Sequence, residues 1–184
     1  MTRQLAIAAA LVAAACGQPT SVFPEYYVLD PSVEGDVRDE VRAAFDDWCE
    51  RSGGLACATE LEWPATEAKT VPVLVRVVDQ VELDRDGFEN TWAVMQTKSK
   101  RMRVSRDVVD AKRTETRAHV LRHLLRHEIG HACLVAGDGH LAYDSPGEVL
   151  MSGGHKWLPV IPGPAAPLGI DDLSLSAFLA ECAW

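Results

Sequence analysis

The sequence predicts an α+β domain in which a small, mixed, twisted sheet is combined with an early helix, a long second helix and a C-terminal helix. The clearest strand is the β-branched run Val71–Val78, whose proline lies near its start, where a missing N–H is tolerated. The clearest helices are Asp36–Cys49 and about Glu115 to Val135, which show helical patterns. With 184 residues, the chain is long enough for one domain with a core and too short for two ordinary ones.

The first half of the chain combines short strands with one amphipathic helix. Tyr26–Leu29 is expected to form the first strand. The helix over Asp36–Cys49 ends at the glycine pair Gly53-Gly54. Its apolar face consists of Val37, Val41, Phe45 and Trp48. Leu55–Trp63 and Val71–Val78 follow as strands.

The second half contains two more short strands and two helices. Thr91–Thr97 and Met102–Ser105 are expected as strands, after a turn at Asp84–Gly87. The long helix that follows is expected to stop at Gly137. The chain is then rich in glycine and proline until Asp171-Asp172, where two acids open a last helix.

The N-terminus is typical of an export signal. Arg3 supplies a positive charge, and Leu5–Ala15 is an apolar run too short to span a bilayer. Small residues before Cys16 resemble the bacterial lipoprotein signal, in which that cysteine is lipidated; an ordinary signal peptide is the alternative. We therefore expect a signal peptide over 1–15, a tether over 16–25 and the domain over 26–184, anchored to the cell envelope or secreted.

The cysteines predict disulfides, because export places the chain in an oxidising compartment. With Cys16 assigned to the lipid, four of the five cysteines remain, an even number that allows three connectivities. We favour Cys49–Cys57, which closes a short loop, and therefore Cys133–Cys182. A zinc site of cysteine and histidine is the rival use of these residues, but no Cys-x-x-Cys pair supports it.

Composition and charge restrict the partners. The formal net charge is -9, with 47% hydrophobic and 24% charged residues, which is ordinary globular composition. A chain this acidic is repelled by phosphate backbones, which argues against a nucleic-acid partner. A membrane is expected as a partner only through the lipid on Cys16, and the domain is expected to be a monomer.

The segment with the most specific chemistry is His127-Glu128-Ile129-Gly130-His131. Two histidines four apart on a helix lie on one face, with Cβ atoms about 5–6 Å apart, which suits two nitrogens that bind one Zn²⁺. Glu128 lies about 100° around the helix, near the metal but free to act on a water molecule. The alternative is a solvated helix face that happens to be rich in His and Glu.

A catalytic zinc ion needs a third protein ligand and an open position. We expect His140 as this ligand, because Gly137-Asp138-Gly139-His140 lets the chain turn back after the helix.

The stretch HEIGHACLVAGDGH resembles the metzincin clan of zinc peptidases, whose site reads His-Glu-x-x-His-x-x-Gly-x-x-His. Glu148–Ser152 looks like the clan's Met-turn, and Met102–Asp110 looks like the strand and loop before its site helix. The resemblance implies a zincin-like fold, a matrixin-like minimal catalytic domain and Met151 below the metal. It also implies that Thr91–Thr97 is the edge strand along which an extended peptide pairs.

The chain departs from the clan pattern after His131, where three extra residues precede the Gly-x-x-His element. One more helical turn, or a bulge, would absorb them. This departure leaves Asp138 as the alternative third ligand beside His140.

Several other residues have two readings. His119 and His123 continue the four-residue spacing and could hold a second metal, although polar residues that support the first site are commoner. Tyr143 and His155 could stabilise an oxyanion. Met151 could also be an ordinary core residue.

The predicted function is a zinc-dependent endopeptidase that acts on peptide or protein substrates. Zinc-activated water hydrolyses the peptide bond, Glu128 is the general base, and His127, His131 and His140 hold Zn²⁺. The main alternative is a zinc-binding surface lipoprotein without proteolytic activity, and a third is a purely structural envelope protein. Metal content separates the third from the other two, and peptide cleavage separates the first two.

Overall fold

The computed structural model describes residues 21–66, 69–89, 91–111, 115–133, 150–151 and 169–183, and the structural statements below concern these residues. They form an α+β fold around a mixed five-stranded sheet with the strand order β3-β2-β4-β6-β5. The strands are β2 (Tyr26–Leu29), β3 (Thr59–Leu61), β4 (Val73–Val78), β5 (Ala93–Gln96) and β6 (Arg101–Ser105). The helices are α1 (Gly35–Arg51), α2 (Gln80–Arg85), α3 (Arg106–Ala111), α4 (Glu115–Gly130) and α5 (Asp172–Glu181).

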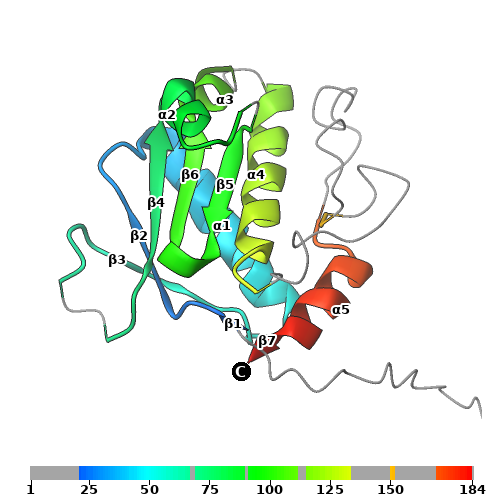
Figure 1. The fold of residues 1–184 in the computed structure, drawn as a ribbon. Coiled ribbons are helices and arrows are strands. Elements are labelled where there is room, and N and C mark those ends of the chain that lie inside the picture. The colour runs from blue at the N-terminus through cyan, green and yellow to red at the C-terminus, as the bar shows by residue number, and fades with distance from the viewer. Residues whose placement is uncertain are drawn as a thin grey trace, which may run out of the picture.

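The sheet has one strand of opposite direction, and that strand is an edge. Neighbouring strands from β3 to β6 run parallel, whereas β5 pairs antiparallel with β6. A short 3₁₀ turn, Thr97–Ser99, joins β5 to β6, and Lys100 closes it with a φ of 52°. Helix α4 runs alongside the β5 edge (Figure 1).

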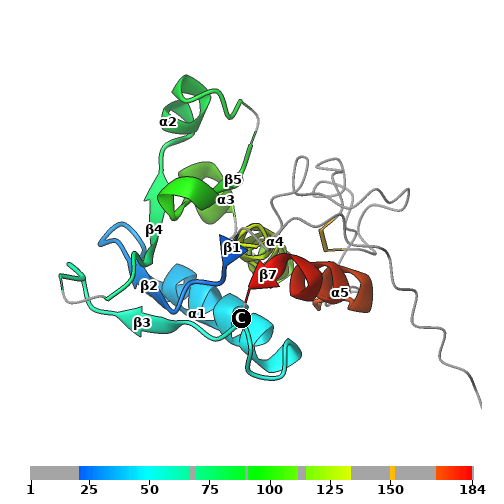
Figure 2. The same ribbon diagram turned by 60° about the horizontal axis from the view of Figure 1, so that its bottom comes forward.

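The hydrophobic core lies between one face of the sheet and the helices α1 and α4 (Figure 2). Alternation along β4 points Val73, Val75 and Val77 into this core. The helices meet them with residues at helical spacing. These are Val41, Phe45 and Trp48 from α1, and Leu121, Leu125 and Ile129 from α4.

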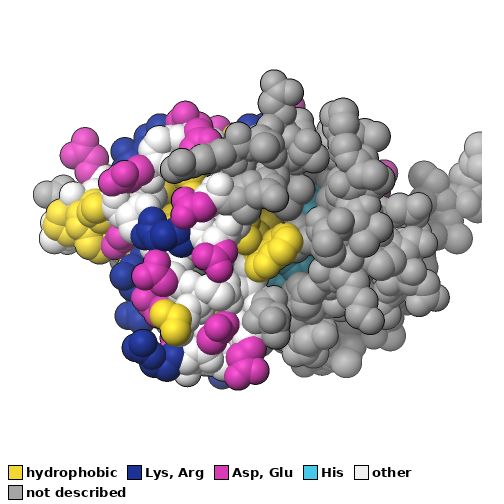
Figure 3. All heavy atoms as spheres, turned by 90° about the horizontal axis from the view of Figure 1, so that it is seen from above, with side chains coloured by type: hydrophobic (Ala, Val, Ile, Leu, Met, Phe, Trp, Pro, Cys, Tyr) yellow, Lys and Arg dark blue, Asp and Glu magenta, His cyan; other side chains and the backbone are white. Residues whose placement is uncertain are grey.

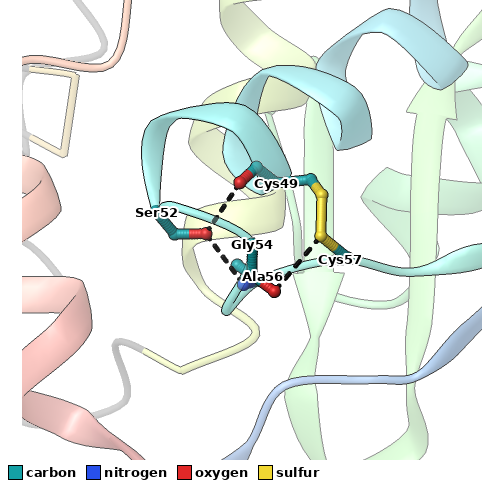
Figure 4. The surroundings of a disulfide bond; sticks show 5 residues. All are labelled: Cys49, Ser52, Gly54, Ala56 and Cys57. Atoms are coloured by element: carbon teal, nitrogen blue, oxygen red, sulfur yellow. Dashed lines mark hydrogen bonds between the residues drawn. A yellow bond between two sulfur atoms is a disulfide. The ribbon is translucent and has the colours of Figure 1, made fainter.

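The end of α1 is fixed by a disulfide and a hydroxyl group (Figure 4). Cys49 and Cys57 are bonded, and the Ser52 hydroxyl donates to the Cys49 carbonyl at 3.1 Å and accepts from the Ala56 N–H at 2.8 Å. Gly53 and Gly54 follow with φ of 68° and 92°, a region that glycine adopts without strain. The predicted helix, its glycine stop and this disulfide are confirmed.

The second predicted disulfide, Cys133–Cys182, is also present. It joins the turn after α4 to β7 (Cys182–Ala183), which pairs with β1 (Ser21–Val22) in a separate small sheet. Phe23 is buried against Phe178 of α5. Residues 21–23, which lie inside the stretch predicted as a tether over 16–25, are therefore paired with β7 or packed against α5. No helix in the described ranges is long and apolar enough to cross a membrane.

The structure corrects several predicted boundaries. α4 ends at Gly130 instead of continuing to Val135, and the N–H groups of Ala132 and Cys133 bond three residues back in tight turns. Residues 131–133 therefore do not continue the helix, and the residues that follow them, 134–149, lie outside the described ranges. The helices α2 and α3 were not predicted, because six residues carry too little periodicity. Only Thr59–Leu61 of the predicted strand Leu55–Trp63 pairs with the sheet.

Candidate metal centre

His127 and His131 converge at the C-terminal end of α4. Their Nε2 atoms are 3.2 Å apart, and the two rings are nearly perpendicular, at 85°. His127 is buried, while His131 is partly exposed. Histidine side chains are visible at the surface in Figure 3. The two Nε2 atoms thus lie close together, as the spacing of four predicts.

The tautomer of His127 follows from its second ring nitrogen. Nδ1 lies 2.6 Å from the Leu150 carbonyl oxygen, which can only accept a hydrogen bond. Nδ1 therefore carries the proton of the neutral ring, and Nε2 presents its lone pair on the side that faces His131. Histidines that bind metals are commonly oriented in this way by a backbone carbonyl.

Glu128 directly follows His127 in the sequence. Its side chain is buried and accepts a hydrogen bond from the edge strand β5. Its Oε2 accepts the Met95 N–H at 2.7 Å, and only 4% of the residue is exposed. Burial raises the pKa of this carboxyl to about 7, and the Met95 hydrogen bond opposes the rise. A carboxyl with a pKa near neutrality can both accept and return a proton.

Leu150 and Met151 are held between α4 and α5. The Leu150 N–H donates to Asp171 at 2.7 Å, and the Met151 N–H donates to the Ser174 hydroxyl at 3.1 Å. Asp171 is the N-cap of α5 and accepts from the Ser174 N–H at 2.8 Å. The start of α5 therefore positions the carbonyl that orients His127.

The side chain of Met151 packs directly under the site helix. A Cβ built on Gly130 would lie 2.5 Å from Met151 Sδ and 3.1 Å from Trp48 Cζ2. Glycine at this position allows the methionine and the tryptophan to approach the helix backbone. Met151 is fully buried, so it is part of the hydrophobic core and also lies beside Gly130 of the segment His127–His131.

The other predicted site residues are placed only in part. His140, Asp138, Tyr143 and His155 lie outside the described residues, as do the signal peptide and Cys16. His119 lies in α4, but its side chain is not among those described; His123 is buried on the same helix. Within the described residues, no three His, Cys, Asp or Glu side chains form a group that could hold a metal.

Several groups that build the site were missed in the sequence. The Leu150 carbonyl and the Met95 N–H are backbone groups, so no residue type marks them. Asp171 does carry a signal, because an aspartate directly before a helical run is typical of an N-cap. The Thr97 hydroxyl, which donates to the His131 carbonyl at 2.8 Å, lies in a turn without any such pattern.

No protein-family model matches this chain, and no curated protein matches it with significance.

Proposed function

We propose that this protein is an exported zinc-dependent endopeptidase with a metzincin-like fold, in which His127 and His131 bind Zn²⁺ and Glu128 is the general base. The observation that carries the proposal is the geometry of the histidine pair. In a tetrahedral site with Zn–N bonds of about 2.0–2.1 Å, two ligand nitrogens are about 3.3 Å apart. The observed separation of the Nε2 atoms is 3.2 Å.

A hydrogen bond between the two rings is the competing interpretation of this short contact. It requires His131 Nε2 to carry a proton, because the Leu150 carbonyl fixes the proton of His127 on Nδ1. Such a pair would leave Glu128 buried beside it without a chemical role. The zinc site gives all three motif residues a role, which favours it.

The residues of this chain supply the proton transfers of hydrolysis. A bound zinc ion supplies Lewis acidity, which polarises the substrate carbonyl and acidifies water. Glu128 removes a proton from the attacking water and then delivers it to the nitrogen of the leaving amine as the C–N bond breaks. The pKa of about 7 suits both steps at neutral pH.

The edge strand supports a peptide substrate. Among the described strands, β5 pairs with β6 alone, and extended peptides bind to such sheet edges by main-chain hydrogen bonds. Trp92, which precedes the strand, is 37% exposed and offers an apolar surface at the rim. Two disulfides support an exported location, where thiols are oxidised.

A zinc-binding surface protein without peptidase activity is the second candidate. The histidine pair supports it equally, but Glu128 does not, because zinc binding alone requires no carboxyl there. The two candidates differ in peptide hydrolysis and agree in metal content.

Metal analysis tests the site itself. The purified domain should bind about one zinc ion per chain, and His127→Ala and His131→Ala should each abolish this binding. Asp172→Ala, an exposed change in the first turn of α5, is the control and should retain the zinc. Retention of zinc by both histidine variants would disprove the assigned ligands.

The third ligand is tested by two further variants. We expect His140→Ala to weaken zinc affinity far more than Asp138→Ala, measured by competition with a chelator. The reverse order would identify Asp138 as the ligand. Two mild effects would place the third ligand elsewhere, with His155 as the next candidate.

A further inference from the structure

The backbone groups of strand β5 point alternately towards β6 and towards the opposite edge of the strand. The Ser105 N–H donates to the Trp92 carbonyl at 2.8 Å, so Trp92 faces β6. In an antiparallel ladder, hydrogen-bonded pairs alternate with pairs that exchange no hydrogen bond. The N–H and C=O groups of Ala93 and Met95 therefore point away from β6, towards the side where α4 lies.

One of these outward N–H groups is used inside the molecule. The Met95 N–H donates to Glu128 Oε2 at 2.7 Å, and this contact is buried. A second contact fixes the same region of strand and helix, because the Thr97 hydroxyl donates to the His131 carbonyl at 2.8 Å. Two hydrogen bonds thus hold the end of the edge strand against the residues of the histidine motif.

We infer that the backbone N–H of Met95 is a positioning group for Glu128, a role that rests on the proposed peptidase function. A glutamate has three rotatable side-chain bonds, and a hydrogen bond from a rigid strand restricts all of them. Oε2 is occupied by the N–H and is the weaker base of the two oxygens. Oε1 is therefore the atom that takes the proton from water and returns it to the leaving amine.

Proline substitutions on β5 separate positioning from substrate binding. Because the N–H groups of positions 93 and 95 point away from β6, proline removes no ladder hydrogen bond at either position. Met95→Pro should retain zinc and lower kcat about tenfold to a hundredfold with little change in KM. Ala93→Pro is the matched variant; it removes an edge N–H that does not reach Glu128 and should raise KM instead.

A double-mutant cycle shows whether Met95 acts through Glu128. In the Glu128→Gln background, Met95→Pro should cause no further loss of kcat, because the group that it positions no longer transfers protons. Losses that multiply in the double variant would overturn the positioning role. A wild-type protein that binds zinc but cleaves no peptide would overturn the proposed function instead.

Amide hydrogen exchange tests the contact without any activity and without proline. The Met95 N–H should exchange about tenfold or more slowly than the Ala93 N–H, although both point away from β6. Glu128→Ala should remove this protection, and Glu128→Gln should keep it, because the amide oxygen still accepts. Equal exchange at positions 93 and 95 in the wild type would overturn the inference.

Discussion

The carboxyl group of Glu128 is buried at a cost in free energy, and one backbone N–H donates a hydrogen bond to it. Its pKa is raised to about 7 because the protein removes the carboxyl from water, and one N–H from Met95 only partly compensates. The sequence singles out this residue, because a His-Glu-x-x-His segment would place a carboxyl beside two candidate zinc ligands. It could not identify the Met95 N–H, which reaches Glu128 only after the sheet has formed.

The raised pKa has a consequence for stability in the protein stripped of metal. A carboxyl whose folded pKa lies above its unfolded value stabilises the fold at low pH, and this contribution is lost as the pH rises through about 7. Between pH 5 and pH 8, wild type should therefore lose roughly 2–3 kcal/mol of unfolding free energy relative to Glu128→Gln. Urea unfolding of both proteins with a chelator present measures this difference. Parallel pH profiles for the two proteins would show that the carboxyl is not buried.

Helix α4 ends at Gly130, although glycine has a low helix propensity. Replacing Gly130 by alanine should gain about 1 kcal/mol in propensity, but the new methyl group would meet Met151 and Trp48. Overpacking of this kind costs about 1–3 kcal/mol. We therefore expect Gly130→Ala to lower stability and weaken zinc retention, measured by urea unfolding and metal content.

Met151→Ala provides the control for this prediction. In that background, Gly130→Ala should be less harmful than in the wild type, because the obstructing thioether is gone. An equal cost in both backgrounds would show that Met151 does not pack against the helix.

The start of α5 is the second element on which the site depends. Asp171 is partly buried, which raises its pKa, but hydrogen bonds from Leu150 and Ser174 outweigh burial and the pKa is lowered. Its contribution to stability is therefore present above its ordinary pKa and is lost as the pH falls through the lower folded value.

Removing this N-cap should destabilise the fold and the site together. Asp171→Ala should cost about 1–3 kcal/mol at pH 7, because it removes the cap and leaves the Leu150 N–H without an acceptor. The neighbouring exposed change, Asp172→Ala, should cost much less. Thermal unfolding and zinc content of the two variants measure the difference, and equal effects would contradict the role of Asp171.

At the scale of the whole molecule, the sequence predicts the elements better than their ends. The β2 strand, the α1 helix and both disulfides are confirmed, because periodicity, β-branched runs and paired cysteines are local signals. The predicted end of α4 at Val135 was wrong by five residues; α4 ends at Gly130, where the helix meets Met151, Trp48 and Thr97, contacts that spacing does not reveal. Sheet order and the direction of β5 depend on long-range pairing, which spacing does not reveal.

In the candidate site, too, local sequence patterns predict some of the residues and long-range contacts supply the others. Spacing predicts that His127, Glu128 and His131 lie together, because the first two are in the last turn of α4 and His131 follows it directly. The groups that orient them come from β5, the Leu150–Met151 segment and α5, which only the fold brings together. The residues with the most specific pattern are therefore close together in the sequence, whereas the groups that orient them are far apart in it.

Peptide hydrolysis by wild type and Glu128→Gln, measured side by side with a broad peptide library, shows whether the protein is a peptidase that uses Glu128 as its general base. Both proteins should contain about one zinc ion per chain, so that metal content is matched. We expect cleavage by the wild type and a loss on the order of 10²–10⁴-fold in Glu128→Gln, the range for a positioned proton-transfer group. Equal rates in the two proteins, or no cleavage by zinc-loaded wild type, would contradict this expectation.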